Sequence, residues 1–157
     1  MKFEKQESPQ GFCIFCEDIR QEINGKQTFV GTIPGGELNV LGVLPTAIGK
    51  FCIHATYKQR LSDDMGPLVI EVHMPGDDED KPTARAQTSL SELAEKLAQP
   101  ESDDPFIGIA MGFEFNPLEI KKEGKILVSA IRAGKRYKLG ALGVKSRPLE
   151  QKKEAAN

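Results

Sequence analysis

The sequence contains no tryptophan, only two histidines and few aromatic residues of any kind, at 6% of the chain. The interior of the folded protein must therefore be built mainly from Ile, Leu, Val and the eight Phe residues. No apolar run approaches the roughly 20 residues that a helix needs to cross a bilayer, so a membrane is not expected as a partner. The first eight residues are largely charged or polar and lack the apolar segment of a secretion signal.

Strong charge of either sign is also missing, since the net charge is −2 and the isoelectric point is about 5.8. Such a balance produces no long-range field that would recruit nucleic acid or an anionic membrane. The last third of the chain is rich in Lys and Arg, but Tyr137 is its only aromatic residue suited to stacking on bases. Nucleic acid is therefore not expected as a partner. The three cysteines are an odd number, which leaves at least one thiol unpaired and favours a reduced, cytoplasmic protein.

Motifs of several enzyme classes are absent. The glycine-rich segment 31–36 lacks the Lys-Ser/Thr pair and the following helix of a phosphate-binding loop. The nucleophile elbow Gly-x-Ser-x-Gly and the metalloprotease motif His-Glu-x-x-His do not occur. The sequence predicts no catalytic residue, no cofactor and a non-enzymatic protein.

What the sequence does contain is a series of short apolar strands separated by tight turns. Asn24-Gly25, Glu123-Gly124 and Ala133-Gly134 are typical of such turns, because glycine readily takes the positive φ that hairpins need. The segment 50–58 shows the strand period most clearly, with apolar residues at its odd positions. Strands are expected at residues 11–18, 26–33, 38–44, 50–59, 67–74, 83–88, 106–115, 125–132 and 137–144.

One short helix is expected near residues 90–99. Ser89-Leu90-Ser91-Glu92 fits a capping box, and the apolar stripe that follows ends near Gln99-Pro100. Inside the segment 106–115, Gly108 and Gly112 suggest a bulge or a close backbone contact.

These elements predict an all-β protein, an antiparallel β-sandwich of immunoglobulin-like or similar Greek-key type with about eight or nine strands. An up-and-down barrel is the main alternative. A parallel α/β fold is disfavoured because only one helix is found. The expected organisation is a flexible arm over residues 1–10, a single sandwich domain over residues 11–146 and a disordered tail over residues 147–157.

Two cysteine-containing pairs, Cys13-x-x-Cys16 and Cys52-x-His54, together offer the four nitrogen or sulfur ligands that zinc takes. The odd separation of Cys13 and Cys16 places them on opposite faces of a regular strand, so we interpret them as small buried residues. Cys52 and His54 share a face, but positions two apart on a strand are ~6–7 Å apart. That spacing is loose for an activated Cys–His nucleophile.

An acidic loop at residues 77–80 could supply oxygen ligands for calcium. Calcium takes roughly 6–8 oxygens from several directions, and four consecutive acids do not form that shell alone. Solvated turn acids are the simpler interpretation, so no metal site is predicted. The candidate ligands that the sequence offers are Cys52 and His54 for zinc and Asp77, Asp78 and Asp80 for calcium.

The stretch from Phe15 to Gly31 contains Cys16-Glu17-Asp18-Ile19-Arg20, then Asn24-Gly25-Lys26, then Val30-Gly31. It resembles the opening of an uncharacterised bacterial family known only as a domain of unknown function. The turn at 123–125 and its two strands look similar to the last hairpin of that family. The resemblance covers residues 11–146 and implies a β-sandwich; it brings no catalytic residue or ligand with it.

We therefore expect a non-enzymatic β-sandwich that acts through protein–protein contacts with a partner that the sequence does not name. Sheet edges and loops would form the contact surface, by strand addition or by self-association into a homo-oligomer. The alternative is a β-sandwich that binds a small molecule or a metal at Cys52, His54 and the acidic loop. One version of this alternative is a hydrolase.

Overall fold

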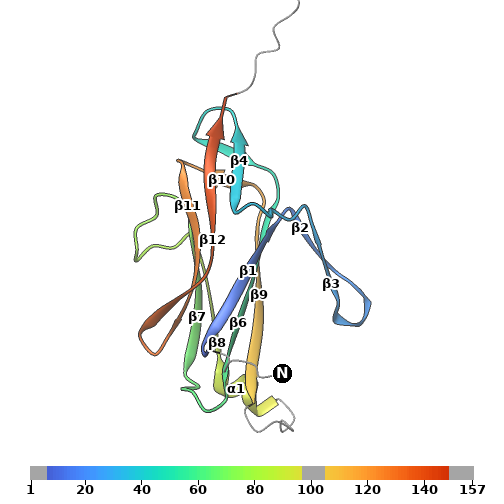
Figure 1. Cartoon of the computed structure of the whole chain (residues 1–157), viewed down its shortest axis with the longest axis vertical. Coiled ribbons are helices and arrows are strands. Elements are labelled where there is room, and N and C mark those ends of the chain that lie inside the picture. The colour runs from blue at the N-terminus through green and yellow to red at the C-terminus, as the bar shows by residue number, and fades with distance from the viewer. Residues whose placement is uncertain (1–6, 97–104, 149–157) are drawn as a thin grey trace, which may run out of the picture.

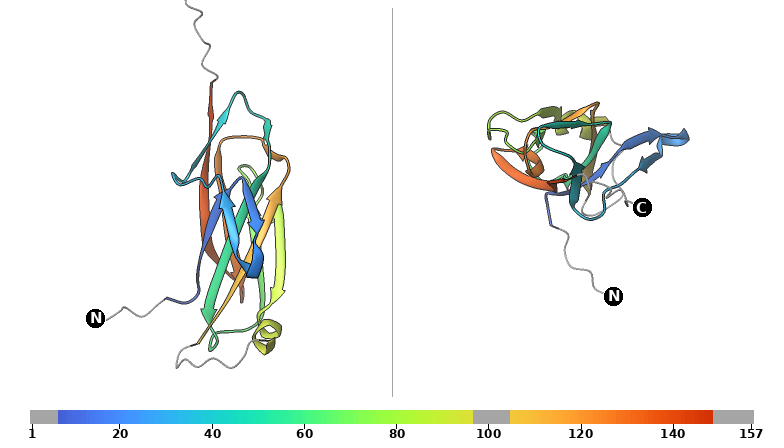
Figure 2. Two further views of the ribbon diagram at one scale, coloured as in Figure 1. Left: turned by 90° about the vertical axis from the view of Figure 1, so that its right-hand side faces the viewer. Right: turned by 90° about the horizontal axis from the view of Figure 1, so that it is seen from above.

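The computed structural model describes residues 7–96 and 105–148. Two mainly antiparallel sheets pack face to face (Figure 1). The three-stranded sheet has the order β1 (Gln10–Cys16), β6 (Phe51–Arg60) and β9 (Phe106–Phe115). The five-stranded sheet has the order β4 (Glu37–Leu41), β12 (Lys135–Arg147), β11 (Gly124–Arg132), β7 (Pro67–His73) and β8 (Ala84–Ser89). Figure 2 shows the two layers from the side and from above.

Smaller elements complete the described structure. Strands β2 (Asp18–Gln21) and β3 (Gln27–Val30) form a hairpin that projects from the sandwich (Figure 1), with a short 3-10 turn, Ile23–Gly25, at its tip. Strands β5 (Thr46–Ile48) and β10 (Leu118–Ile120) pair separately, and α1 (Leu90–Lys96) follows β8. No helix among the described residues is both long and apolar enough to span a bilayer.

The core lies between the two sheets and follows the period of two in their strands. The odd positions of β6 from 51 to 57 are buried there, as the alternation predicts. They meet the inward positions of β7 and β11, two interior strands of the other sheet, which are Leu68, Ile70, Val72, Ile126, Val128 and Ala130. This continuous cluster is the main stabilising feature of the fold.

The two sheets approach each other most closely where β1 passes β12. A Cβ atom at Gly11 would lie 2.6 Å from Leu139 Cδ2, and one at Gly140 would lie 2.8 Å from Cys13 Cβ. Both distances are below contact range, so these two positions require glycine for the strands to lie this close.

The predicted all-β class is confirmed, and the arrangement is a two-layer one. It is not an up-and-down barrel, because β1 pairs with β6 and β12 pairs in parallel with β4 rather than each with its sequence neighbours alone. The described residues form twelve strands, more than the eight or nine expected. The additional ones include β2, β5 and β10, whose three or four residues are too few to show a period.

Two of the three expected glycine turns, Asn24-Gly25 and Ala133-Gly134, join paired strands as the sequence indicates. The third, Glu123-Gly124, is not a hairpin turn, because β10 before it pairs with β5 rather than with β11. Asn24 and Gly25 have φ values of 65° and 73°, and Ala133 and Gly134 have φ values of 47° and 70°. Two successive positive φ angles match the right-handed twist of the flanking hairpin strands. Ala133 is the unusual member, because a side chain with a Cβ is strained in this region.

The predicted boundaries need small corrections. Ser8 Oγ accepts a hydrogen bond from the Arg60 amide at 3.0 Å, and β1 begins at Gln10, so the end of the expected arm joins the sheet. Strand β12 continues to Arg147, into the expected tail. The helix begins at Leu90, with the Glu92 amide donating to Ser89 Oγ at 3.4 Å as in a weak cap. Its expected end at Gln99-Pro100, like residues 1–6 and 149–157, lies outside the described residues.

Candidate functional site

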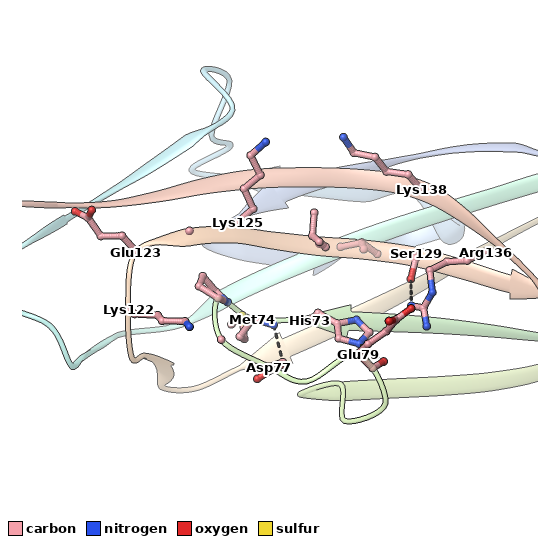
Figure 3. A pocket seen from close by; sticks show the side chains of 15 residues that line it. His73, Met74, Asp77, Glu79, Lys122, Glu123, Lys125, Ser129, Arg136 and Lys138 are labelled. Carbon is pink, nitrogen blue, oxygen red and sulfur yellow. Dashed lines mark hydrogen bonds between the residues drawn. The ribbon is translucent and has the colours of Figure 1, made fainter.

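A groove of about 690 Å³ runs along the outer face of the five-stranded sheet, between the loop that follows β7 and the strands β11 and β12 (Figure 3). The loop contributes Met74 and Asp77, and the neighbouring strands contribute Lys125, the exposed Leu127 and Lys138. Figure 3 shows the side chains of Lys125 and Lys138 extending toward the same side from adjacent strands. The groove is therefore a mainly apolar floor with cations along one rim.

A charged row crosses the same sheet face next to the groove. Glu71 is only 5% exposed, although it lies on the outward face of β7. Arg136 Nη1 donates to Glu71 Oε2 at 2.9 Å and to Ser129 Oγ at 3.0 Å, and Arg85 Nε lies 3.7 Å from Glu71 Oε1. The hydrogen bonds of the Arg136 guanidinium link β12 to β7 and β11. Because the Glu71 carboxylate neutralises this guanidinium, Arg136 is not available to bind an anion.

The acidic loop lies at the end of this groove, and its first acid is already engaged. Asp77 Oδ2 accepts hydrogen bonds from the Met74 amide at 2.8 Å, the Thr83 amide at 3.0 Å and the Thr83 hydroxyl at 2.7 Å. Burial raises the pKa of Asp77, but these hydrogen bonds outweigh it and hold the pKa below its ordinary value. Asp77 therefore stabilises the loop through side-chain-to-backbone hydrogen bonds of the Asx type.

The remaining candidates of the acidic loop stay on the surface. Asp78 Oδ2 lies 3.4 Å from Lys81 Nζ, and Asp80 is exposed. His73 Nε2 lies 3.1 Å from the Glu79 carbonyl oxygen, so the imidazole also ties down the loop. Within residues 7–96 and 105–148, no group of three or more His, Cys, Asp and Glu side chains is placed to hold a metal ion.

The cysteines lie where β1 and β6 pair. Cys13 faces inward toward Gly140, whereas Cys16 lies directly opposite Cys52 in register on the other face. The expectation that Cys13 and Cys16 lie on opposite faces is confirmed. Burial raises the pKa of Cys52, and burial followed by the nearby Cys52 raises that of Cys16, so both thiols are protonated at neutral pH.

His54 lies on the outer face of the three-stranded sheet, beneath the β2–β3 hairpin. The ring of Phe29 meets the imidazole edge-on at a centroid distance of 5.0 Å, and His54 is only 9% exposed. Burial lowers the pKa of His54, which keeps the imidazole neutral at physiological pH. The sequence predicted the hairpin itself from Asn24-Gly25, but it gave no sign that Phe29 would cover His54.

An ion pair network fastens the base of the hairpin to the sheet. Lys50 Nζ lies 2.6 Å from Asp18 Oδ1 and 3.1 Å from Glu114 Oε2, and it lowers the pKa of Asp18 through its hydrogen bond. A small cavity of about 210 Å³ remains between hairpin and sheet beside Cys52 and His54. These two residues thus share a face, as expected, but the space beside them is narrow.

The free edge of β9 is the feature that sequence reasoning missed. Strand β9 pairs with β6 from Phe106 to Phe115 without a register shift, so the bulge suggested by Gly108 and Gly112 is absent. Its other edge has no neighbouring strand among the described residues, and Figure 1 shows it at the margin of the sheet. On the outward face Gly108, Ala110 and Gly112 are exposed. The uninterrupted apolar run in 106–113 could have signalled an edge open to pairing.

Comparison with protein-family models, with curated proteins and with solved structures finds no match for this chain.

Proposed function

We propose that this chain is a non-enzymatic β-sandwich that acts through protein–protein contacts, and that the main contact is strand addition at the free edge of β9. The observation that carries the proposal is the length and composition of this edge. It extends over ten residues and contains no Lys, Arg or Pro. Edge strands of soluble proteins usually carry such residues, because they prevent pairing with other chains.

The physics of strand addition fits this edge. An added strand satisfies the unpaired amide and carbonyl groups of β9 and gains affinity from main-chain hydrogen bonds. The small outward residues Gly108 and Ala110 present no bulky side chain at the edge, whereas Gly112 lines the small cavity next to the β2–β3 hairpin, with Ile19 and Gln27. Neither glycine has a left-handed φ, so the backbone conformation of β9 does not require them.

The state of the cysteines and histidines supports the non-enzymatic part of the proposal. Cys16 and Cys52 are buried thiols with raised pKa values, and His54 is a neutral imidazole covered by Phe29. A covalent mechanism needs a thiolate or an activated hydroxyl within reach of a base. The three free thiols, with Cys13 the most accessible, support the cytoplasmic location that we propose.

The test is affinity capture from the native host lysate with three baits. The baits are the wild-type chain, Ala110→Lys at the centre of the β9 edge, and Ala47→Lys at an exposed alanine of β5 as the matched control. We expect at least one protein to bind the wild type and the control but not Ala110→Lys. Recovery of the same proteins by all three baits would show that the β9 edge is not the contact.

A second candidate function is the binding of a small molecule in the groove beside the acidic loop. The observation that favours it is a groove of about 690 Å³ with an apolar floor at Leu127 and Met74 and the cations of Lys125 and Lys138 above it. Asp77, Glu79 and Glu123 also line the groove, so this lining suits a small molecule with an apolar body whose anionic group is placed beside the two lysines. A rise in melting temperature with an anionic amphiphile, lost in Leu127→Glu, would support this function over the first.

A further inference from the structure

We infer that the strand added to β9 is β9 of a second copy of this chain, paired antiparallel about a two-fold axis at Ala110. The inference rests on the proposed function, because it names the partner of that same edge. The two three-stranded sheets would then join into one continuous sheet, with three strands from each copy. Such an isologous contact closes on itself and gives a dimer rather than a fibre.

Within residues 7–96 and 105–148, no strand covers the core at the free edge of β9. On β6, the inward residues Ile53, Ala55 and Tyr57 are at most 1% exposed. Their neighbours on β9 are only half-buried, although all are apolar; these are Ile109, Met111, Phe113 and Phe115. A further strand beyond β9 would cover this exposed apolar surface, which gives the pairing a hydrophobic driving force.

The residues of β9 match themselves when the strand is reversed about Ala110. In this register Gly108 lies opposite Gly112 of the second copy, and Ile109 lies opposite Met111. Small outward residues then face small ones, and inward apolar residues face apolar ones of similar size. An axis at Ile109 would instead place Gly112 against Phe106, and an axis at Met111 would place Gly108 against Glu114.

Charge at the ends of the strand favours the same register. Glu114, whose side chain is 58% exposed, would lie opposite Phe106 of the second copy. Lys58 Nζ lies 4.5 Å from the centre of the Phe106 ring, and Arg60 Cζ lies 5.9 Å from it. The carboxylate of each copy, which already lies 3.1 Å from Lys50 Nζ of its own chain, would therefore also approach two cations of the other copy, at both ends of the pair. Exposed charge contacts of this kind determine the register of the two strands more than the affinity of the dimer.

The edge of the other sheet gives a useful contrast. Strand β8 is six residues long and carries Arg85 on its outward face, beside Glu71. A short strand with a charged side chain resists pairing with another chain. Strand β1, at the opposite edge of the three-stranded sheet, also lacks cations, but it has only seven residues and its Phe15 carbonyl oxygen already accepts from the Ile33 amide. The β9 edge, with ten residues and no cation, offers the longer surface for self-pairing.

Sedimentation analysis of the full chain tests the inference, using Ala110→Lys, Ala110→Glu and the control Ala47→Lys. Like charges would face each other across the axis in either Ala110 variant, and we expect each to weaken the dimer about tenfold or more. An equimolar mixture of the two Ala110 variants should restore a dimer, because the introduced lysine of one copy then faces the introduced glutamate of the other. A wild type that stays monomeric up to about 100 µM, or variants that dimerise like the control, would overturn the inference.

Cysteine cross-linking with oxidised glutathione tests the register itself. Ala110→Cys should form a disulfide-linked dimer on its own, whereas Gly108→Cys should do so only when mixed with Gly112→Cys. The space around Gly108 and Gly112 accepts a side chain, and the wild type controls for its native thiols. Equal cross-linking of Gly108→Cys alone and in the mixture would refute this register.

The two proposals fail in different ways. The wild type could be monomeric while a lysate protein binds the wild type but not Ala110→Lys. Strand addition at β9 would then stand, and the second copy would not be the partner. If Ala110→Lys changes neither self-association nor capture, the β9 edge is not a contact surface and both proposals fail.

Discussion

Replacing Gln59 by leucine should destabilise the protein, because Gln59 is the hub of a fully buried polar network. Its side chain is 0% exposed, and its Oε1 accepts from the Tyr57 hydroxyl at 2.6 Å and from Arg132 Nη1 at 3.0 Å. Its Nε2 donates to the Asp64 carbonyl oxygen at 2.9 Å. The network thus connects β6 to β11 and to the turn that follows β6.

The magnitude follows from the groups that Gln59→Leu would leave without partners. The hydroxyl of Tyr57 loses its acceptor in a fully buried place, which costs about 1–3 kcal/mol. Arg132 keeps the Asp64 carbonyl oxygen, at 3.0 Å, so its loss is partial. Leucine has a similar volume and leaves little cavity. We therefore expect the free energy of unfolding to fall by about 2–3 kcal/mol, and the melting temperature to fall by about 4–12 °C.

Urea and thermal unfolding, followed by circular dichroism, would measure this loss, and Tyr57→Phe provides the control. Phenylalanine removes the hydroxyl that Gln59→Leu would orphan, so the second substitution should cost at least about 1 kcal/mol less in the Tyr57→Phe background. A cost below about 0.5 kcal/mol for Gln59→Leu, or additive costs in the double variant, would refute the reasoning.

Three further predictions concern His54, Ala133 and the three cysteines. Burial lowers the pKa of His54 in the folded protein, so on acidification the unfolded chain binds this proton first. The free energy of unfolding should therefore fall as the pH drops below about 6.5. Urea titrations at several pH values should show a smaller fall for His54→Phe. Ala133→Gly should raise the free energy of unfolding by about 0.5–1 kcal/mol, because it relieves the positive φ of 47°; no change in the urea midpoint would contradict this. Burial raises the pKa of Cys13 to about 12 and also raises those of Cys16 and Cys52, so all three should react slowly with Ellman's reagent until the chain is unfolded. Rapid labelling of one thiol in the folded protein would instead indicate a reactive site.

Part of the candidate site followed from local rules. The odd spacing of Cys13 and Cys16 placed them on opposite faces, because side chains alternate along any regular strand. The shared face of Cys52 and His54 followed in the same way. The covering of His54 by Phe29 did not, because it depends on where a hairpin elsewhere in the chain folds back.

The acidic loop shows the same division. Its composition offered oxygen ligands, but the hydrogen bonds of Asp77 to Met74 and Thr83 depend on the path of the loop. The glycines of β9 were interpreted as a bulge or a close backbone contact, because sequence alone does not show whether a glycine serves its own backbone or an open edge. Only the pairing partners of β9 distinguish the two.

The sequence by itself determined that the chain is built of strands, where two of the hairpin turns fall and which face of β6 enters the core between the sheets. These properties depend on neighbouring residues, through the alternation of side chains and the positive φ angles at Asn24-Gly25. The tertiary structure decided that β1 pairs with β6, that the β2–β3 hairpin covers His54 and that β9 is an edge strand among the described residues. Pairing between distant strands depends on how whole faces fit together in space. Every strand has the same period of two, so the period does not show which strands become neighbours in a sheet.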